Sequence, residues 1–181
     1  MGAGPQFCIS HMNIDITLEE PKWASLALVP LAEDAAKATL TLLGINPDHC
    51  EISLLACNDA RIATLNAEFR DRTGATNVLS WPANDLAAQN EGGMPELPKA
   101  DFTGGMALGD IAIAWETCER EARTADKPMT EHVTHLIVHG VLHLLGFDHV
   151  RDPDATLMME KEVEILGKLG ISNPYKGTDG P

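Results

Sequence analysis

Residues 139–149 read HGVLHLLGFDH, a stretch that predicts a helix, its end and the turn that follows. His139 and His143 are four residues apart, so on a helix their rings project from one face about one turn apart. Gly146 stands where helices commonly end in a left-handed residue, and the chain reversal there can bring His149 back toward the first two rings. Three neutral imidazoles that converge with one coordination position left open are typical of a catalytic zinc site. The pattern therefore predicts an enzyme with His139, His143 and His149 as metal ligands.

The same spacing, His-x3-His-x2-Gly-x2-His, occurs in the metzincin metalloproteases. Those enzymes need a glutamate directly after the first histidine, as the base that deprotonates water. Here that position is Gly140, which cannot move a proton. This argues against proteolysis, and a peptidase or amidase with Asp148 as its base stays open as the alternative. Asp148 can also orient a ligand ring or cap backbone amides in a turn.

Two further histidines lie upstream on the same predicted helix. A ligand set of His135, His139 and His143 would occupy consecutive turns of one straight helix, over about 12 Å at 1.5 Å per residue. Tetrahedral coordination needs ligand nitrogens within a few ångström of one another, so this set is disfavoured. We expect His135 to be packed or to support a ligand ring, and His132 to face solvent.

Length and composition indicate one ordinary globular domain. The 181 residues are 44% hydrophobic, enough for a single core. No apolar run is long enough to span a membrane, and the N-terminus lacks the pattern of a secretory signal. The cysteines show no metal-binding spacing, so we expect reduced thiols in a cytoplasmic protein. They are Cys8, Cys50, Cys57 and Cys118.

The charge balance is acidic. Thirteen Lys and Arg residues against 27 Asp and Glu residues give a formal net charge of −14. Such a surface disfavours sequence-independent attraction to nucleic acid, although a local basic cleft stays possible. Two groups of basic residues could form one: Arg61, Arg70 and Arg72, and Arg120, Arg123 and Lys127.

Apolar periodicity predicts strands and helices that interleave along the chain. The expected strands are Asn13–Leu18, Glu51–Ala56, Asn77–Trp81 and Gly109–Trp115. The expected helices are Trp23–Leu43, which would continue through Pro30, then Asp59–Phe69, Glu116–Ala125, the histidine helix and Asp152–Lys168. The histidine helix should begin at an N-cap Thr130, with Glu131 in its first turn. It has almost no polar face and should be central and buried.

These elements predict an α+β fold with a four-stranded mixed sheet, about five helices and the metal site on a buried helix of the C-terminal half. We expect one compact domain over residues 13–175, a disordered extension at residues 1–12 and a short tail at 176–181. Residues 83–105 are rich in Pro, Gly, Asn and Ala. They should form a mobile loop or lid, either functional or inert, rather than a packed element.

Six motifs in a fixed order make the chain resemble the YbeY family of endoribonucleases, also called the rRNA maturation factor family, from about Ile52 to Tyr175. They are LNAEFR (65–70), TNVLSWP (76–82), LGDI (108–111), HLIVHG (135–140), LHLLGFDH (142–149) and NPY (173–175). The histidine motif with glycine after its first ligand is specific to this family, and the other motifs are weaker singly. Trp81 stands where the family usually has Phe.

The resemblance implies one Zn²⁺ per chain on His139, His143 and His149, and cleavage of single-stranded RNA. It further implies action in 16S rRNA 3′-end maturation and in late-stage 70S ribosome quality control, with the ribosome or ribosomal subunit proteins as partners. Catalytic roles would fall to His139 and to Arg70, whose guanidinium fork can hold two oxygens of a phosphodiester transition state. A non-catalytic assembly factor, in which zinc only holds the fold, is the remaining alternative.

Overall fold

The computed structural model describes residues 12–176, and within them four strands form one mixed sheet. The strands are β1 (Asn13–Leu18), β2 (Cys50–Cys57), β3 (Val78–Pro82) and β4 (Met106–Ala114). Their order is β1-β2-β4-β3, with β1, β2 and β4 parallel and the edge strand β3 antiparallel to β4. The predicted fold class is confirmed.

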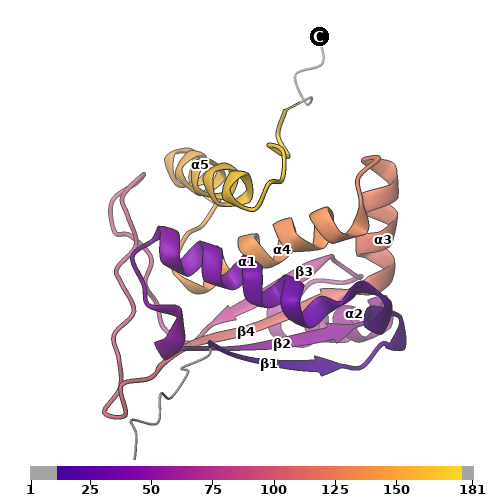
Figure 1. Ribbon diagram of the computed structural model, residues 1–181, viewed down its shortest axis with the longest axis horizontal. Coiled ribbons are helices and arrows are strands. Elements are labelled where there is room, and N and C mark those ends of the chain that lie inside the picture. Colours follow the sequence, from indigo (N-terminus) through magenta and orange to yellow (C-terminus); the bar gives the residue numbers. More distant parts are fainter. Residues whose placement is uncertain (1–11, 177–181) are drawn as a thin grey trace, which may run out of the picture.

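Helices cover the two faces of this sheet unequally (Figure 1). On one face lie α1 (Leu28–Leu42) and α4 (Met129–Leu144), and α5 (Asp152–Lys168) packs on α4 from the far side. The main core lies here, because strand residues such as Ile52 and Leu54 alternate toward these helices. The opposite face carries α2 (Asp59–Arg70) and a smaller core around Cys57. No helix of the described residues is long and apolar enough to cross a membrane.

The histidine helix α4 is the central element, as predicted. It contacts α1, α3 (Trp115–Thr124), α5, β3 and β4. Nine of its 16 residues are buried, among them Val138, Val141 and Leu142 with no exposed surface. A helix held on so many sides is a rigid support for a functional site.

Two predicted helix boundaries are wrong. The expected helix Trp23–Leu43 is divided into a 3₁₀-helix, η1 (Pro21–Leu26), and α1, because Ala27 between them is left-handed with φ of 50°. Pro30 then falls in the first turn of α1, where its missing N–H is not needed. Thr130 is not the N-cap of α4, since the carbonyl of Pro128 already accepts the N–H of His132 at 3.1 Å.

Strand β4 begins at Met106, three residues earlier than predicted. Its pairing with β2 shifts between Glu51 and Ile52, which is the mark of a bulge, and Gly109 lies there with φ of 134°. A Cβ atom at Gly109 would lie 2.1 Å from the carbonyl oxygen of Trp81. Only glycine fits this position, which is why the alternation of apolar and polar side chains along the strand is interrupted there.

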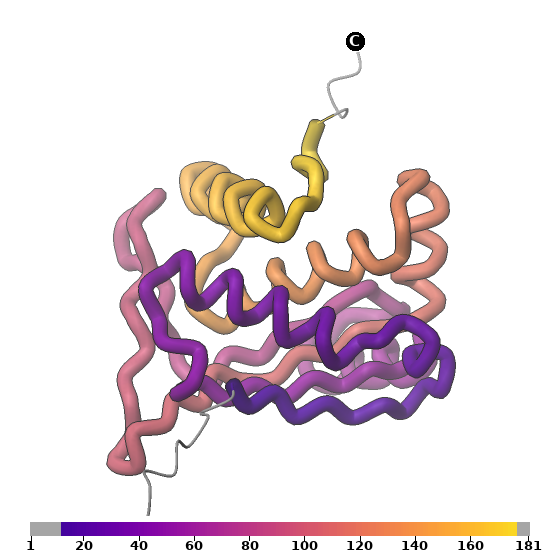
Figure 2. Tube along the Cα trace, in the orientation of Figure 1, coloured from indigo at the N-terminus to yellow at the C-terminus, as the bar shows by residue number. Residues whose placement is uncertain are grey.

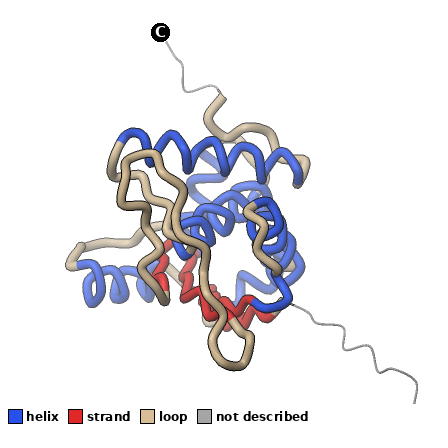
Figure 3. The backbone as a smooth tube through the Cα atoms, turned by 90° about the vertical axis from the view of Figure 1, so that its left-hand side faces the viewer, coloured by secondary structure: helices blue, strands red, loops and turns tan. Residues whose placement is uncertain are grey.

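Residues 83–105 form a long connection without helix or strand, visible at the left of Figure 2 and in front in Figure 3. The prediction that this loop is not packed is wrong for part of it. Leu86 is buried, and its carbonyl accepts the N–H of Glu96 at 2.9 Å. The predicted extension at 1–12 and tail at 176–181 lie outside the described residues, except for Met12, which is buried, and Lys176.

The described cysteines are free and buried. Burial raises the pKa of the Cys50 thiol to about 11 and that of the Cys57 and Cys118 thiols to about 12. They are packing residues, in line with the expectation of reduced thiols, and Cys8 lies outside the described residues.

Candidate metal centre

The structure brings the three predicted ligands together. His139 and His143 project from one face of α4, and His149 returns to them from the turn that follows this helix. One ring nitrogen from each histidine lies within 4.8 Å of the others. The ring centroids are 4.5 Å apart for His139 and His143, 5.0 Å for His143 and His149, and 5.5 Å for His139 and His149.

Gly146 makes this reversal possible. It is left-handed, with φ of 93°, and the N–H of Phe147 donates back to the carbonyl of Leu142 at 3.1 Å. A Cβ atom at Gly146 would also lie 2.6 Å from the carbonyl carbon of Leu86. The predicted helix stop is confirmed, and glycine is required there for two independent reasons.

Hydrogen bonds determine which ring nitrogen of His139 and of His143 is free to bind a metal ion. His143 donates its Nδ1–H to the carbonyl of Phe147 at 2.9 Å, and His139 donates its Nδ1–H to Glu162. The two Nε2 atoms therefore present their lone pairs to each other, at 3.0 Å. This contact is repulsive unless a proton or a cation lies between them. Tetrahedral zinc holds its nitrogen ligands about 3.3 Å apart, so the donor set fits a metal ion of this kind.

Burial, together with the neighbouring charges of His139 and His149, lowers the pKa of His143 to about 4. The ring is therefore neutral at physiological pH. A neutral imidazole is the form that binds a metal ion.

A buried glutamate supports the first ligand. Glu162 of α5 has no exposed surface, and its carboxylate accepts hydrogen bonds from His139 Nδ1, from His135 Nε2 at 3.1 Å and from the Tyr175 hydroxyl. Burial alone would raise the pKa of Glu162, but the hydrogen bonds from His135 and His139, the charge of His139 and the bond from Tyr175 together lower it to about 2. A charged carboxylate thus orients the His139 ring, and it would raise the basicity of that ring toward a bound metal ion.

Glu162 is absent from the site predicted from the sequence. One signal could have identified it, because it lies on the apolar face of α5 with the buried residues Met158, Ile165 and Leu166. A carboxylate among core residues is uncommon unless it is paired.

The other predicted polar residues have mixed outcomes. His135 packs against the site through Glu162, as expected. The prediction that His132 faces solvent is wrong, because its Nε2 lies 2.8 Å from the carboxylate of Glu121 on the neighbouring helix α3. Asp148 accepts the N–H of His149 at 2.7 Å, which favours its role as a turn residue.

Position 140 faces the sheet. A Cβ atom at Gly140 would lie 3.1 Å from Ile111 Cδ1 and 3.4 Å from Ser80 Oγ. A glutamate at this position would have to displace side chains of the sheet, so the buried surroundings of Gly140 do not favour the base of the metzincin peptidases. The structure therefore supports the argument against proteolysis.

Arg70 ends α2 and lies at the edge of the sheet. Its guanidinium donates to the carbonyl of Ser80 on β3 at 2.5 Å, and Ser80 is the residue whose hydroxyl approaches Gly140. Among the described residues, no hydrogen bond or ion pair joins Arg70 to a histidine. Its catalytic role stays a prediction.

Other basic residues that could have formed a cleft are bound to carboxylates. Arg61 pairs with Glu19 at 3.3 Å and Arg120 with Asp59 at 3.9 Å. Arg123 pairs with Glu119 at 3.6 Å. These ion pairs involve three of the six basic residues that the sequence suggested for a cleft.

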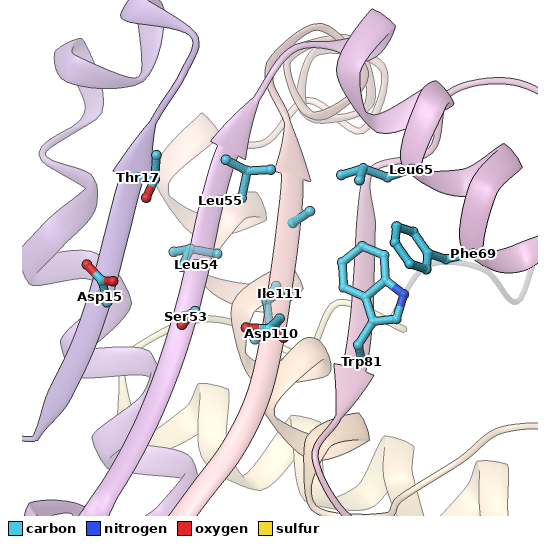
Figure 4. A pocket seen from close by; sticks show the side chains of 11 residues that line it. Asp15, Thr17, Ser53, Leu54, Leu55, Leu65, Phe69, Trp81, Asp110 and Ile111 are labelled. Carbon is cyan, nitrogen blue, oxygen red and sulfur yellow. The ribbon is translucent and has the colours of Figure 1, made fainter.

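A hollow of about 460 Å³ lies on the other face of the sheet, beside α2 (Figure 4). Asp15, Ser53 and Asp110 are neighbours across β1, β2 and β4, and Phe69 meets Trp81 edge to face at 5.8 Å. The histidines lie beyond the sheet, because Ile111, next to Asp110, points toward α4. Asp110 is therefore separate from the candidate metal centre.

The fold and the site define a class of small α+β proteins in which a buried helix and the following turn present three histidines that could hold a metal ion. The family described as endoribonuclease YbeY matches residues 13–170. The chain belongs to the endoribonuclease YbeY family, so the resemblance seen in the sequence motifs is confirmed.

Relatives support this assignment over nearly the whole chain. A Ruegeria pomeroyi protein named endoribonuclease YbeY is 62% identical over 164 residues, which cover 91% of this chain and 98% of the relative. A Bartonella quintana protein of the same name is 42% identical and covers 91% of this chain and 97% of its own length. The solution structure of TM1509 from Thermotoga maritima has a TM-score of 0.52 at 20% identity and covers 93% of this chain and 99% of its own. That likeness supports the fold alone.

Proposed function

We propose that this protein is a metal-dependent endoribonuclease that cuts single-stranded RNA, with one Zn²⁺ held by His139, His143 and His149. The observation that carries the proposal is the convergence of three ring nitrogens within 4.8 Å in a chain of the endoribonuclease YbeY family. When bound, the ion would act as a Lewis acid toward the phosphodiester.

Residues of the chain would orient the metal ligands and bind the phosphate group of the substrate. Glu162 and the carbonyl of Phe147 fix the rings of His139 and His143, so that both present Nε2 to the ion. Arg70 would bind phosphate oxygens with the guanidinium donors that Ser80 leaves free, and would stabilise the charge that gathers in the transition state.

The proposed substrate is the 16S rRNA precursor, cut in 3′-end maturation and in late-stage 70S ribosome quality control in the cytoplasm. A protein with a net charge of −14 binds RNA poorly through its surface as a whole. A flexible strand can reach a local site past an acidic rim more readily than a rigid duplex can. Presentation of the RNA by the ribosome or by ribosomal subunit proteins would supply the remaining affinity.

The test compares cleavage of one RNA sequence as single strand and as duplex, with chelator and after zinc is restored. We expect cleavage of the single strand, its loss with chelator and its recovery with zinc, and a gain when ribosomal particles present the RNA. Equal cutting of both forms, or no gain with particles, would count against the proposed substrate. No cleavage at full zinc occupancy would favour the non-catalytic assembly factor.

A further inference from the structure

His149 differs from the other two histidines in how it is held. It is exposed and lies in an irregular turn between α4 and α5. Its ring has no hydrogen bond to another of the described residues, and its backbone N–H bonds only to the adjacent Asp148. The position of this ring must therefore depend on what anchors the turn.

Loop 83–105 contacts the turn on both sides of His149. Three residues before it, Gly146 fits closely against the backbone of Leu86. Two residues after it, Arg151 donates to the carbonyls of Ala88 at 3.1 Å and Gln89 at 3.4 Å. The loop reaches the level of α5 in Figure 3.

Arg151 is itself held by the first turn of α5. Its Nε pairs with one oxygen of Asp154, and the other oxygen accepts the N–H of Gly92 at 2.7 Å. The hydrogen bond from Gly92 is the main cause that lowers the pKa of Asp154; burial raises this pKa, and the hydrogen bond and charge of Arg151 lower it. Arg151 and Asp154, which we call the clasp, pair with each other and join the loop to the helix start by three hydrogen bonds.

We propose that the clasp is a positioning device for the third metal ligand, and that loop 83–105 belongs to the metal centre rather than being an inert insertion. Without the clasp, the turn would keep its anchors at Gly146 and Phe147 but lose those that follow His149, and the His149 ring would sample more orientations. Metal binding would then have to order the turn at a cost in conformational entropy, so zinc would bind more weakly. The inference rests on the proposed function, because it takes the three histidines as the metal ligands.

The test is zinc affinity, measured by chelator competition on the purified full chain. Arg151→Ala should weaken zinc binding by about 10- to 100-fold, the usual effect of losing a residue that supports a ligand. Arg151→Lys, which can reach one carbonyl but not two, should recover part of the loss. Arg123→Ala is the matched control, because it removes an exposed arginine of an ion pair on α3 and should leave the affinity unchanged.

Cobalt provides a readout that a purely structural role would not change. The visible spectrum of the Co²⁺-loaded protein reports ligand number and geometry, and it should change in Arg151→Ala while the metal-free proteins unfold at similar temperatures. Should Arg151→Ala fail to fold, Asp154→Asn tests the same clasp. This variant loses the ion pair with Arg151, while its amide oxygen can still accept the Gly92 N–H, and it should weaken zinc binding in the same direction.

The outcomes separate the two proposals. A parent protein that binds no zinc would refute the proposed metal centre itself. A parent that binds zinc, with equal affinity and an equal cobalt spectrum in the clasp variants, would overturn the positioning role and leave the metal centre intact.

Discussion

Replacing Glu162 by glutamine removes the negative charge beside His139 with almost no change in the shape of the side chain. In Glu162→Gln one carboxylate oxygen becomes an amide NH₂ group, while the donors around it stay in place: His139, His135 and Tyr175. The NH₂ group faces either His139, whose Nδ1–H also donates, or the pair of His135 and the Tyr175 hydroxyl, which would have to become acceptors. In either orientation at least one of the present hydrogen bonds is lost or reversed.

The size of the effect follows from the contacts. Hydrogen bonds to a charged group contribute about 1.5–3 kcal/mol each, against about 0.5–1.5 kcal/mol for neutral ones. Relief of the buried charge offsets part of the loss, so we expect the free energy of unfolding of the metal-free protein to fall by about 1–3 kcal/mol. Zinc should bind about 10- to 100-fold more weakly, since His139 is no longer oriented by a charge.

The effect should depend on pH with a definite sign. The pKa of Glu162 is lowered from its ordinary 4.5 to about 2 in the folded protein. A lowered pKa contributes stability that is present above pH 4.5 and is lost as the pH falls toward 2. In metal-free protein, the difference in stability between parent and Glu162→Gln should therefore shrink over this range.

The assays are urea denaturation of the metal-free proteins between pH 2 and 7, and chelator competition for zinc at pH 7. Glu160→Gln is the control, because it makes the same chemical change on an exposed position of the same helix. Equal zinc affinity in Glu162→Gln and in this control would refute the role assigned to the buried carboxylate. If the difference in stability between parent and Glu162→Gln grew below pH 4.5, Glu162 would not be negatively charged in the folded protein as assigned.

Four further substitutions test other parts of the structure. His143→Ala should sharply reduce bound zinc by elemental analysis while His135→Ala keeps it, and equal zinc in His143→Ala and parent would eliminate the ligand assignment. Arg70→Lys keeps the charge but loses the fork, so RNA cleavage should fall at nearly unchanged thermal stability. A matching loss of stability would make Arg70 structural. Trp81 Nε1 is buried without a hydrogen-bond partner among the described residues, so Trp81→Phe should leave the free energy of unfolding unchanged or raise it by up to about 1 kcal/mol in urea denaturation. A clear destabilisation would contradict this expectation and show that the indole contributes more by its contacts than its unpaired N–H costs.

The parts of the site that the sequence predicted correctly are those governed by local geometry. The interval between His139 and His143 is set by the helix repeat, and the reversal at Gly146 by the left-handed conformation that glycine adopts readily. The errors lie where tertiary contacts decide. His132 was expected in solvent because nothing local indicates that α3 places Glu121 opposite it.

Glu162 lies between these two cases. It comes from a helix 23 residues beyond His139, so no local spacing connects them. Yet its own helix places it in line with Met158 and Ile165, where an unpaired carboxylate would be strongly unfavourable. Such a carboxylate requires hydrogen-bond donors from the element that packs against its helix. That element is α4, whose histidines are half-buried. A charged residue on an apolar helix face is therefore evidence about the opposite helix as well as its own, and here it points to His135 and His139 of α4, beside the candidate metal centre.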